Sequence, residues 1–195
     1  AVVGSSAISS SGSQAQRIST PEHALRARPS TTSKAVRASG TLVPKAKSVP
    51  AGATMTSEMK AAGVTRVLVL PLYPQYAGAT TGSTMDAVAA WARRTRRVPA
   101  LRFVDQYHAD AGYIEALATT VLAHWQSEGR AERLVLSFHG LPARTLTLGD
   151  PYHCHCRKTA RLLAERLSIA VDTSFQSRFG RDKWLEPATD DVLKA

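Results

Sequence analysis

The chain has 195 residues, of which 44% are apolar, and a formal net charge of +10 at neutral pH. This length suits one domain, or one domain with a tail, and the apolar fraction is enough to form a core. No apolar run in the sequence approaches the roughly 18 residues needed to span a membrane. The charge is uneven, because residues 1–54 contain seven of the 25 Lys and Arg residues and a single acid, Glu22. The remainder is mildly basic and has no nucleic-acid-binding motif, so we expect no nucleic-acid partner.

Residues 1–54 are rich in Ser, Thr, Ala and Pro and show no sustained apolar period. We expect them to form a disordered tail, because they bury too little apolar surface to offset the entropy of ordering. Residues 55–195 are expected to form the folded domain. The two cysteines, Cys154 and Cys156, are too close in sequence for an easy mutual disulfide, which fits a reducing compartment.

The first half of the folded domain is predicted to contain two strands. A helix ends near Gly63, which suits the C′ position. The run RVLVLP at 66–71 predicts a fully buried strand. Ser83 is placed to cap a helix that ends in an arginine cluster. The run ALRFVD at 100–105 predicts the second strand.

The second half continues the alternation of helices and strands. One helix has its apolar residues at helical spacing, namely Ile114, Leu117, Ala118, Val121, Leu122 and Trp125. RLVLSF at 133–138 predicts a third buried strand. A helix follows over 153–167, with Leu162, Leu163 and Leu167 as its core residues. A weaker strand is predicted at 169–175, and a last helix begins near Thr189.

This alternation predicts an α/β fold with an open parallel sheet and right-handed crossovers. Ligands of such sheets bind beyond the carboxyl ends of the strands. Unusual side chains follow each predicted strand, so we expect them to gather at one end of the sheet. They are Tyr73 and Tyr76, Tyr107 and His108, His139, and then Arg178 and Trp184.

His139 lies in the sharpest local motif, SFHGLP at 137–142. It would leave a buried strand directly into a Gly-Leu-Pro turn. An imidazole can act as a metal ligand or as a general base near neutral pH. The alternative is a structural histidine bonded to the loop backbone. No metalloprotease or Ser-His-Asp spacing accompanies it.

Three other segments are each open to two interpretations. The loop LPLYPQYAGATTGS at 70–83 either places phenols and hydroxyls against a flat ligand or forms a rigid turn before a helix. In GDPYHCHCRKT at 149–159, the consecutive His and Cys residues suggest a metal site, but their spacing favours a loop-to-helix transition. Trp184 lies in a basic loop, where it packs either as a lid or as an anchor. The cluster Arg93, Arg94, Arg96 and Arg97 is most simply the solvated end of a helix.

Taken together, these segments resemble ferrochelatase. The resemblance rests on VLVLPLYPQYAGATTGS, VLSFHGLPARTLTLGDPYHCHCRKTARLLAERL and SFQSRFGRDKWLEPATDD, in that order. It covers about residues 57–195 and is closest to the proteobacterial branch. It implies flavodoxin-like halves with helices on both faces of the sheet and a cleft for porphyrin between them.

The resemblance also implies an activity and a set of site residues. The activity is insertion of Fe²⁺ into protoporphyrin IX to form protoheme, in heme biosynthesis in the cytoplasm. His139 matches the catalytic histidine, as a ligand for the incoming iron or as the acceptor of pyrrole protons. Tyr73, Tyr76, Thr81, Ser83, Tyr107 and Trp184 match residues around the porphyrin. The substrates are porphyrin and Fe²⁺; no cofactor or iron–sulfur cluster is expected, and peripheral membrane contact stays open.

The chain also departs from the family pattern. The family's amino-terminal strand should precede about residue 50, and its second acid–base residue, a glutamate, should follow residue 195. We therefore expect an incomplete domain that lacks half of the cleft. Two alternatives remain: a chelatase for another divalent metal, and a non-catalytic porphyrin-binding or structural remnant.

Overall fold

The structure is a computed structural model, and it describes residues 6–11, 14–18, 59 and 62–195. Its strands are β1 (Ser6–Ser11), β2 (Gln14–Ile18), β3 (Arg66–Val69), β4 (Ala100–Phe103), β5 (Arg133–His139) and β6 (Val171–Gln176). Its helical segments are the π-helical turn η1 (Gly78–Gly82), α2 (Ser83–Arg94), α3 (Ala111–Glu128), α4 (Arg144–Thr147), α5 (Tyr152–Leu167) and α6 (Thr189–Lys194). From β3 onward strands alternate with helices, and the predicted α/β class is confirmed.

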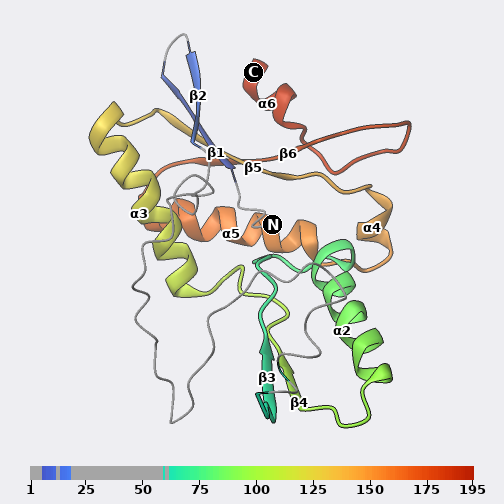
Figure 1. Cartoon of the computed structure of the whole chain (residues 1–195). Coiled ribbons are helices and arrows are strands. Elements are labelled where there is room, and N and C mark those ends of the chain that lie inside the picture. The colour runs from blue at the N-terminus through green and yellow to red at the C-terminus, as the bar shows by residue number, and fades with distance from the viewer. Residues whose placement is uncertain (1–5, 12–13, 19–58, 60–61) are drawn as a thin grey trace.

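The core lies between the β5–β6 pair and the helices α3 and α5. β5 and β6 are parallel, and both run above α5 in Figure 1. Every second side chain of β5 points toward these helices, because side chains of a strand alternate between its two faces. The buried core residues of these four elements are Ala118, Val121, Trp125, Leu134, Leu136, Phe138, Tyr152, Cys156, Ala160, Leu163, Leu167 and Phe175. The helical periods predicted for α3 and α5 are confirmed, except that Leu122 is exposed and Leu162 is only partly buried and lies outside the core cluster.

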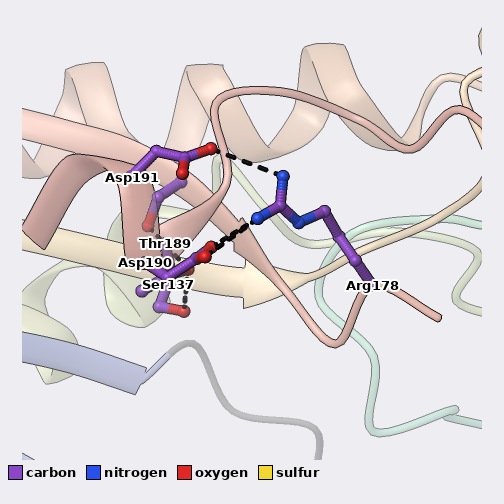
Figure 2. Close-up of polar contacts among 6 residues, drawn as sticks. Ser137, Arg178, Thr189, Asp190 and Asp191 are labelled. Carbon is purple, nitrogen blue, oxygen red and sulfur yellow. Dashed lines mark hydrogen bonds and ion pairs between the residues drawn. The ribbon is translucent and has the colours of Figure 1, made fainter.

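α6 packs on the opposite face of the same strands, so helices cover both faces of this pair (Figure 1). Ser137 of β5 points to that side, where its Oγ lies 2.7 Å from Thr189 Oγ1. The Oγ of Ser174 lies 3.0 Å from the same hydroxyl. Figure 2 shows Arg178 beside this buried cluster, where it donates to Asp190 at 2.8 Å. Buried hydroxyl contacts and a solvent-exposed ion pair therefore hold α6 to the sheet.

β3 and β4 form a second parallel sheet, in which Arg66 pairs with Ala100 and Val69 with Phe103. No other strand of the described residues pairs with either of them. In Figure 1 they lie across α5 from β5 and β6. The parallel strands are thus divided between two sheets rather than joined in one. The burial predicted for the strand at 66–71 is wrong, since Leu68 is 65% exposed. A two-stranded sheet leaves both edges and much of each face uncovered.

Two short pieces of the 1–54 stretch are strands rather than disordered chain. β1 runs antiparallel to β5, and β2 runs antiparallel to β1. Strand pairing uses backbone N–H and C=O groups, so it does not require the apolar side chains that this composition lacks. The rest of the predicted tail and its boundary at residue 54 lie outside the described residues.

Two local predictions concern the ends of helices. Gly63 has φ +62°, which suits the predicted C′ position, whereas most of the helix predicted before it lies outside the described residues. Ser83 is not a helix cap, because η1 already forms the turn before it, and its hydroxyl donates to the carbonyl of Thr80 at 2.8 Å. Among the helices of the described residues, none combines the length and the apolar character needed to cross a bilayer.

Candidate active site

β5 carries His139 from the core to the surface. The five residues from Leu134 to Phe138 are buried, and His139, at the end of the strand, is exposed. The next residue, Gly140, donates its N–H to the carbonyl of Gln176 at 2.7 Å. A Cβ at Gly140 would lie 2.6 Å from that carbonyl oxygen. Only glycine allows this approach, so the glycine of SFHGLP fixes the backbone beside His139 against the end of β6.

The loop after β6 returns to the loop after β5 and places Trp184 next to His139. Ala143 donates its N–H to the carbonyl of Lys183 at 2.8 Å, and Leu185 donates to Leu141 at 2.9 Å. The indole N–H of Trp184 donates to the carbonyl of Phe179 at 2.9 Å. The rings of Trp184 and Phe179 are 4.7 Å apart. The Trp184 side chain is therefore held in place by the hydrogen bond of its indole N–H and by its contact with the Phe179 ring.

An open hollow of about 480 Å³ lies between these two loops. Its lining residues are His139, Gly140, Leu141, Pro142, Arg144, Phe179, Gly180, Arg181, Asp182 and Trp184. One imidazole thus shares the hollow with apolar and aromatic side chains, two guanidinium groups and one carboxylate. Such a surface suits a flat apolar ligand with anionic groups, held next to a group that can bind a metal or accept a proton.

The loop after β3, residues 70–83, contains Tyr73 and Tyr76 and is called the tyrosine loop. It lies against α5 and not beside the hollow. Tyr76 donates its N–H to Nδ1 of His155 at 3.2 Å, and Gly78 donates to Asp150 Oδ2 at 2.8 Å. The hydroxyl of Tyr152 donates to the carbonyl of His139 at 3.0 Å. The start of α5 therefore contacts both the tyrosine loop and the end of β5.

The predicted site residues are only partly brought together. His139 and Trp184 share the hollow, whereas Tyr73, Tyr76 and Tyr107 are half-buried and do not line it. Tyr107 packs edge-on against Tyr113, with ring centroids 5.6 Å apart, and burial raises the pKa of its phenol. The roles in substrate binding that the resemblance implies for these residues stay predictions.

Thr81 and Ser83, the two hydroxyl residues predicted as site residues in the loop after β3, also lie outside the hollow. Thr81 is fully buried, and its hydroxyl has no hydrogen-bond partner among the described residues. The hydroxyl of Ser83 donates to the carbonyls of Ala79 and Thr80 in η1. Neither of them lines the hollow beside His139.

The HCHC segment is the first turn of α5, as the loop-to-helix interpretation predicts. His153 stacks on Phe175 at 5.5 Å, whereas His155 stacks on His108 at 3.7 Å. Cys154 is exposed, and Cys156 is fully buried, which raises the pKa of its thiol. The four side chains take different directions. Among the described residues, no three His, Cys, Asp or Glu side chains gather so that they could hold a metal ion.

Residues 44–195 of the chain match the ferrochelatase family. The chain belongs to this family. It is 64% identical over 147 residues to the ferrochelatase of Methylibium petroleiphilum, and these aligned residues cover 74% of the chain and 40% of that protein. It is also 50% identical over 149 residues to the ferrochelatase of Pseudoalteromonas atlantica, and these aligned residues cover 75% of the chain and 41% of that protein. The chain spans about 40% of the length of these relatives.

The ferrochelatase match includes every residue of the hollow and of the α5 contacts. Sequence reasoning found His139 and Trp184 because they follow predicted strands. It missed the contacts of Asp150, Tyr152 and His155 with the two loops. The available signal was the GDPY sequence at the start of α5, which was weighed as part of a metal site or of a loop-to-helix transition but not as a contact to other loops.

Proposed function

We propose that this chain takes part in the ferrochelatase reaction, insertion of Fe²⁺ into protoporphyrin IX. The observation that carries the proposal is the exposed His139 in a hollow with an aromatic wall, within a chain of this family. The whole activity belongs to proteins of which this chain spans about 40%, so it is proposed for the chain as part of such a protein.

The chemistry explains why an imidazole is needed at this place. Two pyrrole N–H protons must leave the macrocycle as the metal enters. A neutral imidazole can coordinate Fe²⁺ or accept one of these protons. His139 is exposed at the end of a rigid buried strand, so its backbone position is fixed while its ring can reach a ligand.

The walls of the hollow explain how a porphyrin would bind. The rings of Phe179 and Trp184 offer apolar surface to a flat macrocycle. Arg144 and Arg181 line the same hollow and can attract carboxylate groups at the edge of a porphyrin. Arg144 also lies 3.5 Å from Asp182, an exposed pair that is easily exchanged for a ligand carboxylate.

We place this activity in the cytoplasm. The support is the pair of free thiols, Cys154 and Cys156, which suit a reducing compartment. Fractionation of cells that contain the protein, with and without a salt wash of the membranes, tests the location and any peripheral membrane contact.

The His139→Ala substitution tests the proposed function. Porphyrin affinity is measured by fluorescence quenching in the 195-residue chain. Insertion rate is measured in the same chain joined to the remaining segments of the Methylibium petroleiphilum ferrochelatase. We expect the variant to keep most of its porphyrin affinity, because that affinity comes from many apolar contacts. Insertion should fall by about 10²–10⁴-fold, as is typical when a positioned acid–base group is removed.

The control is the His124→Ala variant, which removes a histidine from α3 outside the hollow. Near-normal insertion by His139→Ala would refute the catalytic role. Loss of porphyrin affinity together with the fold would show that His139 is structural. Binding without insertion by the joined protein would favour the non-catalytic porphyrin-binding alternative.

A further inference from the structure

The first turns of α5 make hydrogen bonds to the backbone of the tyrosine loop. Asp150, just before the helix, accepts the N–H of Gly78 at Oδ2 and the N–H of Tyr152 at Oδ1, at 2.8 Å and 3.0 Å. His155 accepts the N–H of Tyr76 at Nδ1, at 3.2 Å. One carboxylate and one imidazole therefore satisfy two backbone donors, one in the irregular stretch before η1 and one at the first residue of η1.

A second, buried set of contacts lies behind these. The Gln75 side chain donates from Nε2 to Thr159 Oγ1 at 3.1 Å, and that hydroxyl donates to the carbonyl of His108 at 2.8 Å. The His108 ring stacks on His155 at 3.7 Å with an interplanar angle of 9°. Stacking fixes the orientation of the His155 ring, so its Nδ1 stays directed at the Tyr76 amide.

The other side of the same helix end holds the backbone of His139. Tyr152 is 8% exposed, and its hydroxyl donates to the His139 carbonyl at 3.0 Å. Burial raises the pKa of this phenol, so it stays protonated and remains a donor. Tyr152 and His155 lie on one helix, whose core residue Leu163 is fully buried.

We propose that the segment Asp150–His155 is a positioning clamp, which sets the tyrosine loop and His139 in a fixed arrangement. This inference rests on the proposed function, because it assigns the clamp to the porphyrin site. None of these side chains lines the hollow, so they are positioning residues and not catalytic ones. A rigid helix end that bonds to both backbones keeps their separation constant when a large flat ligand binds.

The clamp also explains the HCHC segment without a metal ion. The His155 side chain accepts a hydrogen bond from the tyrosine loop, and the Cys156 side chain lies in the core. Cys154 is exposed and has no hydrogen bond to the tyrosine loop among the described residues. A substitution at Cys154 in the same turn is therefore a matched control for a substitution at His155.

The first test measures amide hydrogen exchange in the full 195-residue chain. In His155→Ala, the Tyr76 amide should lose about 2- to 12-fold of its protection, the range that one hydrogen bond supplies. His155→Asn offers an amide oxygen as acceptor and should restore part of this loss. Cys154→Ser should leave the Tyr76 amide unchanged. The amide of Leu163 serves as an internal reference for the folding of α5.

Two results of this experiment would overturn the clamp. One is unchanged protection at Tyr76 in His155→Ala. The other is an equal loss at Tyr76 and Leu163, because α5 as a whole would then depend on His155. Tyr152→Phe tests the other side. It should shift the NMR resonances of the His139 imidazole while leaving Tyr76 exchange unchanged, and an unmoved His139 signal would remove Tyr152 from the clamp.

The second test adds protoporphyrin IX to the same variants, each joined to the remaining segments of the Methylibium petroleiphilum ferrochelatase, and follows fluorescence quenching. We expect weaker binding in His155→Ala and unchanged binding in Cys154→Ser. If the unsubstituted joined protein does not bind porphyrin while Tyr76 of the His155→Ala chain still loses protection, the proposed function fails and the loop contacts stand. If the joined protein binds porphyrin and His155→Ala binds equally well despite a loosened loop, the clamp has no role in the site and the inference is refuted.

Discussion

His139 and His155 show two different ways in which a histidine is used in this chain. His139 ends a buried strand and is exposed to the hollow. His155 is half-buried on α5 and accepts a backbone hydrogen bond. The first was predicted from its place after an apolar run. The second depends on a contact between residues 79 positions apart in sequence, which no local pattern encodes.

His108 makes the stability of the protein dependent on pH. Burial, followed by the positive charges of His155 and Lys158, lowers the pKa of His108 from 6.5 to about 4. The unfolded chain keeps a pKa near 6.5. Between these pH values the unfolded chain therefore binds a proton that the folded chain does not, so stability is full above pH 6.5 and is lost as the pH falls toward 4.

We expect the free energy of unfolding to decrease by roughly 1 to 3 kcal/mol over this interval, measured by urea unfolding at several pH values. The His108→Phe variant should keep the stack on His155 and reduce the pH dependence, since Nδ1 of His108 has no partner among the described residues. His124→Gln, a change outside this cluster, should keep the wild-type slope. An equally steep slope in His108→Phe would contradict the assignment.

At the scale of elements, β5 and α5 were predicted almost residue for residue. Both have continuous or periodic apolar patterns that a buried strand and an amphipathic helix require. α4, at Arg144–Thr147, was not predicted, because four residues are too few for a period to show. Ser83 was misassigned as a cap, because its sequence context does not reveal that η1 has already begun the helix.

The attachment of α6 to the sheet depends on the hydroxyl of Thr189, which lies beside Ser137 in Figure 2. This hydroxyl is 2.7 Å from Ser137 Oγ and 3.0 Å from Ser174 Oγ. Thr189→Val keeps the shape of the side chain and removes this hydroxyl. Ser174 can still donate to the carbonyl of Leu136, but Ser137 loses its partner in the buried cluster. We expect a loss of about 1 to 3 kcal/mol in the free energy of unfolding, the cost of an unsatisfied buried polar group.

Denaturant unfolding of Thr189→Val measures this loss. Asp191→Asn is the control, since its contact with Arg178 is exposed and 3.4 Å long, and we expect a change within about 0.5 kcal/mol. Equal stability of Thr189→Val and the unsubstituted protein would show that the hydroxyl cluster does not hold α6.

At the scale of the whole molecule, the α/β class was predictable and the division into two sheets was not. Alternation of apolar strands and amphipathic helices indicates parallel pairing, and both parallel pairs form. Which strands become neighbours depends on contacts between distant segments, and β1 occupies the edge of β5 that faces away from β6. The apolar run at 66–71 correctly predicted a strand, but the burial that it also predicted is wrong, because Leu68 is exposed.

This division predicts that the two sheets differ in local stability. β5 has five consecutive buried residues and packs on helices at both faces, whereas β3 and β4 have no fully buried residue and a single partner strand each among the described residues. Segments with few buried apolar contacts open with a lower free energy than core strands. Native-state hydrogen exchange should therefore show faster exchange for the amides of β3 and β4 than for those of β5 and β6.

Two substitutions test the same difference by denaturant unfolding. Leu134→Ala in β5, where the side chain is fully buried, should cost about 2 to 5 kcal/mol, because it removes core contacts and leaves a cavity. Leu68→Ala in β3 should cost much less, since most of that side chain already contacts water. Similar losses at the two positions, together with equal protection of the two sheets, would show that β3 and β4 share the main core. A smaller loss at Leu68 with faster exchange of its sheet would place the stability of this ferrochelatase-family chain in the β5–β6 unit that presents His139.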